Sequence, residues 1–188
     1  MSGLLVVISG PGGVGKDTLI ERLRAADPRL VYAVSYTTRP RRAYEVDGRH
    51  YCFVDEAHFW RLDIDGELME HARINGHLYG TSNSRVERSR AEGFDVILKI
   101  DVQGAAQIRQ RVPDAVAIFV SPPSMEELWR RRQHRGSEPP DVIEARQRLA
   151  EQEMAQVDRY DHVVVNDDAA RAVDQIEAIL EQERKGRG

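Results

Sequence analysis

The chain has 188 residues and a formal net charge of −4, with 41% hydrophobic and 31% charged residues. These values are typical of one soluble globular domain with small inserted lobes, and the acidic balance disfavours non-specific binding to nucleic acid. The one cysteine, Cys52, excludes an internal disulfide, and the apolar run at residues 4–8 is too short to span a membrane. We therefore expect a cytoplasmic protein without a nucleic-acid or membrane partner.

The first predicted element is a buried strand over residues 4–8, followed by the glycine-rich stretch GPGGVGKDT. Leu19, Ile20 and Leu23 then recur at helical spacing up to residue 27. Strand, glycine loop and helix form the context of a phosphate-binding loop, in which backbone N–H groups and a lysine bind nucleotide phosphates. The predicted ATP-binding residues of this loop are Gly10, Pro11, Gly12, Gly13, Val14, Gly15, Lys16, Asp17 and Thr18.

Asp17 departs from the phosphate-loop pattern, which has a hydroxyl residue directly after the lysine. An acidic residue suits the first turn of a helix. Beside nucleotide phosphates, however, a carboxylate is repelled unless Mg²⁺ or its water shell lies between. Asp17 is thus either a helix-terminus residue or a candidate neighbour of Mg²⁺, and Thr18 is a candidate for bonding a phosphate oxygen.

Residues 35–90 are richer in polar and aromatic residues and lack long apolar strands, so we interpret them as an inserted lobe. Arg39 and Arg42 lie three apart in an extended stretch, where they could clamp a phosphate. Asn75-Gly76 predicts the two-residue turn of a hairpin. Within that hairpin, strand alternation predicts that Leu68 and Glu70 share one face.

Further apolar strands at residues 96–98, 115–120 and 162–165 alternate with helical segments, which predicts a parallel sheet with crossover helices. Asp101 follows the first of these strands, where ligands bind in open parallel sheets, and is a second candidate neighbour of Mg²⁺. Lys99, in the same strand, is expected to extend its side chain at an edge of the sheet.

Residues 122–149 are predicted to be a second insertion with two helices. Ser124 and Glu127 form a capping box that starts the first helix, which we expect to stop at Gly136. The six histidines show no metal-ligand spacing. The last residues, 183–188, are expected to fray.

Five segments together resemble guanylate kinases in their order and spacing, and this resemblance covers essentially the whole chain. They are SYTTRPRRAYEVDGRHYCFV (35–54), ELMEHARINGHLYGTS (67–82), DVILKIDVQGA (95–105), RRRQHRG (130–136) and VVVNDD (163–168). The resemblance implies an α/β phosphate-loop (P-loop) kinase with a central parallel sheet flanked by helices. Its core would comprise about residues 1–34, 91–121 and 150–188, with an inserted GMP-binding lobe at 35–90 and a helical lid at 122–149.

The resemblance implies transfer of the γ-phosphoryl group of ATP to GMP, and also to dGMP, with Mg²⁺, by a monomer or small homo-oligomer. Glu70 would read guanine, because its carboxylate can accept hydrogen bonds from both donors of that base. Lys16 and the lid arginines Arg131, Arg135 and Arg146 would be catalytic, and Asn166 would lie near the adenine of ATP. The implied GMP-binding residues are Ser35, Arg39, Arg42, Tyr51, Glu70, Tyr79, Gly80, Thr81 and Asp101.

Two other functions stay open on the sequence. Ribose bisphosphate phosphokinases resemble this family and can have aspartate after the loop lysine, but a sugar acceptor has no use for Glu70. A guanylate-kinase-like module that only binds proteins typically lacks the phosphate loop, whereas this chain has Lys16.

Overall fold

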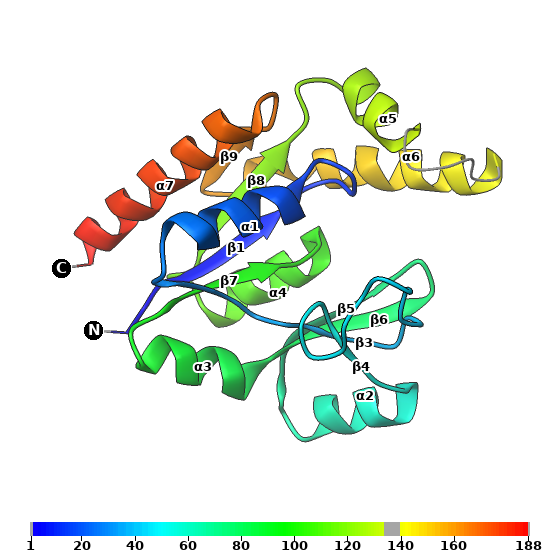
Figure 1. The fold of residues 1–188 in the computed structure, drawn as a ribbon. Coiled ribbons are helices and arrows are strands. Elements are labelled where there is room, and N and C mark those ends of the chain that lie inside the picture. Colours follow the sequence, from blue (N-terminus) through cyan, green and yellow to red (C-terminus); the bar gives the residue numbers. More distant parts are fainter. Residues whose placement is uncertain (1, 134–139, 188) are drawn as a thin grey trace.

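The computed structural model describes residues 2–133 and 140–187, and all of their side chains except those of residues 132–133 and 140–143. Figure 1 shows two sheets of different size. The larger has five strands, all paired in parallel, in the order β2-β7-β1-β8-β9. These strands are β1 (Leu5–Ser9), β2 (Leu30–Tyr32), β7 (Asp95–Lys99), β8 (Val116–Ser121) and β9 (His162–Val165).

The inner strands of the large sheet are apolar on both faces because helices cover both. Val6 and Ile8 of β1 belong to the hydrophobic cluster of α1 (Lys16–Ala26), α5 (Met125–Gln133) and α7 (Ala169–Gly186). Leu5 and Val7 face the other way, into a cluster with α3 (Asn83–Ala91) and α4 (Val102–Arg111). The predicted parallel sheet flanked by helices is therefore confirmed.

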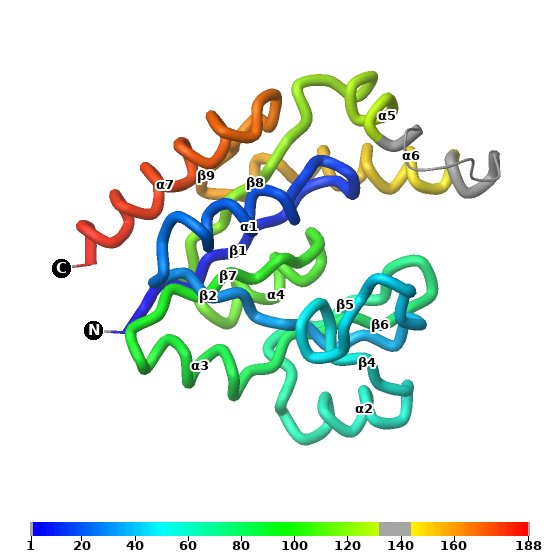
Figure 2. The backbone as a smooth tube through the Cα atoms, in the orientation of Figure 1, coloured from blue at the N-terminus to red at the C-terminus, as the bar shows by residue number. Residues whose placement is uncertain are grey.

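The small sheet has the order β4-β3-β6-β5. Its strands are β3 (Tyr36–Thr37), β4 (Cys52–Phe53), β5 (Leu68–Ile74) and β6 (His77–Ser82). Its outer face packs on α2 (Glu56–Ile64), where Phe59 is buried with Leu68 and Leu78. Figure 2 shows this sheet and α2 on one side of the loop that follows β1, with α5 and α6 (Pro140–Met154) on the other. A short 3₁₀ helix, η1 (Val157–Arg159), connects α6 to β9.

The hairpin of β5 (Leu68–Ile74) and β6 (His77–Ser82) has the predicted turn, since Asn75 and Gly76 both have positive φ angles, 49° and 83°. The prediction that Leu68 and Glu70 share a face is wrong. A bulge lies between them: Leu68 pairs with Ser82, and Glu70 with Thr81. The extra residue breaks the two-residue alternation, so Leu68 packs towards α2 while Glu70 points to the opposite face.

Two other expectations are also wrong. Lys99 does not lie at a sheet edge, because β7 is flanked by β2 and β1. Within the described part of the last segment, residues 183–187, α7 continues to Gly186 instead of fraying, and Arg184 forms ion pairs with Asp27 at 2.8 Å and Asp95 at 2.5 Å. The elements β2, α2 and α3 were not predicted.

The lid segment begins as expected. The Oγ atom of Ser124 accepts the backbone N–H of Glu127 at 3.1 Å at the start of α5. The expected end of this helix at Gly136 lies outside the described residues.

Candidate active site

A cavity of about 350 Å³, called the main cavity below, lies where the glycine-rich loop, the small sheet and α6 meet. Most of its polar lining comes from residues singled out in the sequence, which the fold brings together from distant segments. These residues are Gly10, Gly12, Gly13, Lys16, Ser35, Tyr51, Glu70, Tyr79, Asp101 and Arg146.

The glycine-rich loop joins β1 to α1 in a conformation that only glycine adopts readily. Gly10 has a φ of 133°, and a Cβ atom there would lie 2.1 Å from the carbonyl oxygen of Val120. The Nζ atom of Lys16 donates to the carbonyl oxygens of Gly10 at 2.5 Å and Pro11 at 3.2 Å. The lysine ammonium is therefore held over the loop, at the N-terminus of a helix, where anions bind.

The side chain of Asn166 contacts the same loop. Its buried amide donates to the carbonyl oxygen of Val14 at 2.8 Å and lies against Gly15, where an added Cβ would be 2.6 Å from the amide nitrogen. Thr18 is exposed on α1.

Asp17 and Lys99 form an ion pair, with 2.5 Å between Oδ1 and Nζ. Asp17 lies exposed in the first turn of α1, whereas only 17% of the Lys99 side chain is accessible. Burial disfavours the charge of Lys99, but neighbouring Tyr32, Tyr51 and Asp17 outweigh it, so the pKa of Lys99 is raised. The unusual residue of the loop thus has a specific cationic partner.

Glu70 is buried in β5 and faces the main cavity. Its Oε1 accepts a hydrogen bond from the Thr81 hydroxyl at 2.7 Å. Burial raises the pKa of Glu70 to about 7, against the lowering effect of the Thr81 hydrogen bond. Gly104 of α4 leaves room for this carboxylate, since a Cβ there would lie 2.3 Å from Oε2.

Asp101 caps α4 beside Glu70, and its Oδ1 accepts the N–H of Gly104 at 2.9 Å. The rings of Tyr51 and Tyr79, which also line the main cavity, meet edge to face with 5.8 Å between their centres. Gly80 does not line the main cavity. A side chain there would meet Phe59 and Leu68 on the α2 side, so only its backbone is available to a ligand.

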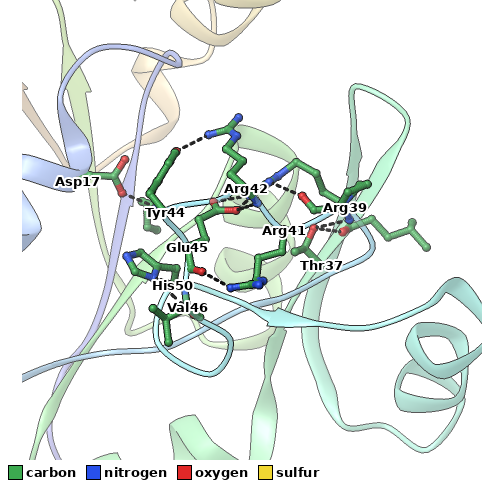
Figure 3. Close-up of polar contacts among 12 residues, drawn as sticks. Asp17, Thr37, Arg39, Arg41, Arg42, Tyr44, Glu45, Val46 and His50 are labelled. Atoms are coloured by element: carbon green, nitrogen blue, oxygen red, sulfur yellow. Dashed lines mark hydrogen bonds and ion pairs between the residues drawn. The ribbon is translucent and has the colours of Figure 1, made fainter.

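Arg39 and Arg42 border a second cavity of about 580 Å³, called the arginine cavity below. Figure 3 shows the buried carboxylate of Glu45 among these arginines. It accepts two hydrogen bonds from the Arg39 guanidinium, at 2.6 and 3.0 Å, and the Arg42 backbone N–H at 2.7 Å. The guanidinium of Arg42 donates to the hydroxyl of Tyr44 at 2.9 Å.

Glu45 is the organising residue of this loop and was not predicted from the sequence. Its hydrogen bonds with Arg39 outweigh burial and lower its pKa, so it is a stable anion. The available signal was a carboxylate three residues after Arg42 in an arginine-rich loop.

The lid arginines differ in position. Arg146 lines the main cavity. Arg131 donates to Glu127 at 2.7 Å and to the carbonyl oxygen of Asn166 at 3.0 Å. Hydrogen bonds from Arg130 and Arg131 lower the pKa of Glu127 to about 2. Arg135 lies outside the described residues.

Within residues 2–133 and 140–187, no group of three or more histidine, cysteine, aspartate or glutamate side chains could hold a metal ion. Across the same residues, no helix combines the length and apolar character needed to cross a membrane.

Comparison with known proteins gives a consistent result. The family model described as guanylate kinase matches residues 2–183. A guanylate kinase of Desulfitobacterium hafniense is 46% identical, over 97% of this chain and 91% of that protein. One of Carboxydothermus hydrogenoformans is 41% identical, over 97% and 89%. The crystal structure of guanylate kinase from Anaplasma phagocytophilum is similar with a TM-score of 0.79 and 36% identity, covering 97% of this chain and 86% of that one.

Proposed function

The chain belongs to the guanylate kinase family and is an ATP:GMP phosphotransferase, and we propose that its small sheet binds GMP while its glycine-rich loop binds ATP. One observation carries this division of the site. The buried carboxylate of Glu70 and the ammonium-bearing loop residue Lys16 line the same cavity from opposite elements. The product GDP would enter purine nucleotide metabolism.

Glu70 selects the base. Guanine presents two adjacent donors, its ring N1–H and its exocyclic amino group, and one carboxylate accepts both. Adenine presents an acceptor at the ring position and would leave the buried carboxylate unpaired, which disfavours it by roughly 10²-fold or more. Two donors from guanine also favour the ionised form of Glu70 over the protonated form.

The acceptor phosphate is bound between the two cavities. The side chains around this position are those of Arg39, Arg42, Tyr51 and Tyr79. Ser35, Thr81 and Asp101 instead complete the contacts to guanine around Glu70. A phosphate acceptor is already an anion at neutral pH, so the reaction needs positioning and neutralised charge rather than a general base.

The ATP phosphates are bound by the backbone N–H groups of residues 10–15 other than Pro11, which has none, by Lys16 and by the Thr18 hydroxyl, with Asn166 towards the adenine. Arg146, Arg131 and Arg135 stabilise charge on the transferred phosphoryl group. Residues 35–90 act as a GMP-binding lobe and residues 122–149 as a lid, and their closure over residues 1–34, 91–121 and 150–188 excludes water.

Mg²⁺ fits this site as an ion that arrives with ATP. It commonly takes one or two protein carboxylates and completes its shell with phosphates and water. The described residues offer carboxylates of that kind in Asp101, which lines the main cavity, and Asp17, at the first turn after the loop. When bound, Mg²⁺ neutralises charge on the phosphate oxygens.

Several finer features belong to the same proposal. dGMP is a further acceptor, because none of the groups proposed for base and phosphate recognition requires the 2′-hydroxyl. The protein acts in the cytoplasm, as a monomer or small homo-oligomer, without a nucleic-acid or membrane partner.

A coupled ADP-release assay tests the proposed function. ATP·Mg²⁺ is supplied with GMP, AMP, CMP, UMP or ribose 1,5-bisphosphate in turn. Strong turnover with GMP alone is the expected result. Turnover with the sugar bisphosphate would move the function to a ribose bisphosphate phosphokinase, and no turnover with any acceptor would favour a binding module.

A further inference from the structure

Lys99 occupies a position that a structural role alone does not explain. It is the last residue of β7, an inner strand of the large sheet, and precedes Asp101 by two positions. Its neighbours on β7 are buried and apolar. A lysine at such a position destabilises the fold unless its charge is paired with an anion. Lys99 also borders both the main cavity and the arginine cavity, so its side chain reaches the boundary between them.

The contacts of Lys99 connect it to the proposed phosphate-binding residues. Its ammonium lies 5.5 Å from the centre of the Tyr51 ring, and the Arg39 guanidinium lies at the same distance from that ring. A second ring, that of Tyr32, is 5.7 Å from the ammonium. Lys99 and Arg39 are thus two cations gathered around one tyrosine.

The carboxylate partner of Lys99 is well placed to be exchanged. Asp17 is 76% exposed, and ion pairs with an exposed member contribute little to stability. A phosphate dianion carries more charge than a carboxylate and has three oxygens that can accept hydrogen bonds from an ammonium.

We propose that Lys99 is a phosphate-binding residue of the acceptor site and that Asp17 holds its ammonium group until GMP binds. This inference rests on the proposed function, because it places GMP in the main cavity. On binding, the Lys99 ammonium moves from the Asp17 carboxylate to the GMP phosphate, next to Arg39 and Tyr51. Asp17 is then the counter-ion that keeps Lys99 ordered in the substrate-free protein.

Titration calorimetry of GMP and guanosine, in EDTA and without ATP, tests the phosphate contact. The two ligands differ only in the phosphate, so the ratio of their Kd values isolates its contribution. Lys99→Met is expected to weaken GMP about tenfold, the loss typical of one hydrogen bond to a charged group, and to leave guanosine unchanged. Lys99→Arg should retain most of the ratio. Lys185→Met, a change of an exposed lysine on α7, is the matched control and should change neither Kd.

A double-mutant cycle with Asp17→Asn tests the exchange. In the otherwise unaltered protein, D17N is expected to tighten GMP binding several-fold, because Lys99 no longer has to leave a carboxylate. In the K99M background, D17N should leave the GMP Kd unchanged. Equal tightening in both backgrounds would overturn the exchange, because it would show that Asp17 acts on the phosphate without Lys99.

The outcomes separate this inference from the proposed function. Failure of the unaltered protein to bind GMP would contradict the proposed function itself. Normal GMP binding by the unaltered protein, with K99M weakening GMP and guanosine equally or changing neither, would overturn the inference alone. Thermal unfolding of each variant shows whether it is folded. If K99M is not folded, the Kd values of K99R for GMP and guanosine are used instead, because arginine preserves the charge.

Discussion

The residue proposed to read the base and those proposed to bind phosphates are held in contrasting ways. Glu70 is buried, receives one hydrogen bond from Thr81 and has Gly104 packed against it. The proposed phosphate-binding cations instead form ion pairs with carboxylates of the chain itself: Arg39–Glu45, Lys99–Asp17 and Arg131–Glu127. A buried carboxylate discriminates between bases because its geometry is fixed before binding. Ion pairs keep these cations near the site in two ways: the buried Glu45 holds Arg39 in place, whereas the exposed Asp17 can be replaced by a phosphate.

Removing the loop cation should have the largest effect. Lys16→Ala is expected to lower kcat about 10³-fold or more, because a positioned charge that stabilises the transferred phosphate is lost. The coupled ADP-release assay measures this, with Lys185→Ala as the control. Full activity of K16A would refute the assignment of the loop.

A change of Glu70, the residue proposed to read the base, should have the next largest effect on activity. Glu70→Gln should lower kcat/KM for GMP about 10²-fold, because an amide offers only one acceptor oxygen to the two guanine donors. The fold should be preserved, since glutamine still accepts from Thr81. Glu92→Gln, which changes an exposed residue, serves as the control. An unchanged kcat/KM for GMP in E70Q would contradict base reading by Glu70.

Burial of Glu70 should also appear in the stability of the substrate-free protein. Burial raises the pKa of Glu70 from its ordinary value of 4.5 to about 7, so the protonated form is favoured on folding. The contribution of protonated Glu70 to the stability of the folded protein is complete below pH 4.5 and is lost as the pH rises through 7. Relative to the unaltered protein, E70Q should gain up to about 3 kcal/mol in free energy of unfolding between pH 4.5 and 8. Urea unfolding of both proteins at pH 4.5 and pH 8 measures this gain. An equal difference in free energy of unfolding at the two pH values would show that burial does not raise the pKa of Glu70.

A change in the loop that contains Arg39, Arg42 and Glu45 should have the smallest effect. Glu45→Gln weakens the hydrogen bonds that hold Arg39 and the Arg42 backbone, so KM for GMP should rise about tenfold while kcat changes less. Steady-state kinetics with GMP measures the split, with E92Q again as the control. A fall in kcat at constant KM would mean that Glu45 acts outside phosphate binding.

The large sheet could be predicted because parallel strands covered on both faces appear as continuous apolar runs. The Asn75-Gly76 turn could be predicted because few dipeptides adopt positive φ at both positions. In contrast, β2 has three residues and depends on β7 for its pairing, so its local sequence carries little signal.

The residues of the candidate site were mostly predicted, but their partners were not. The bulge that separates Leu68 from Glu70 is defined by pairing with β6, which alternation within one strand does not reveal. Asp17 and Lys99 are 82 positions apart, so their ion pair depends on the packing of α1 beside β7. Each residue was notable in the sequence, yet their contact exists only in the fold.

Base reading by Glu70 is tested most directly by the ratio of kcat/KM for GMP and IMP, measured for the unaltered protein and for E70Q. IMP has the ring N1–H of GMP but lacks its exocyclic amino group, so it supplies one donor to Glu70 instead of two. If Glu70 reads the base, the unaltered protein should prefer GMP by about tenfold or more, the contribution of one hydrogen bond to a charged group, and E70Q should show a much smaller preference. Equal kcat/KM for the two nucleotides, or a preference that E70Q leaves intact, would contradict the claim that Glu70 reads the base.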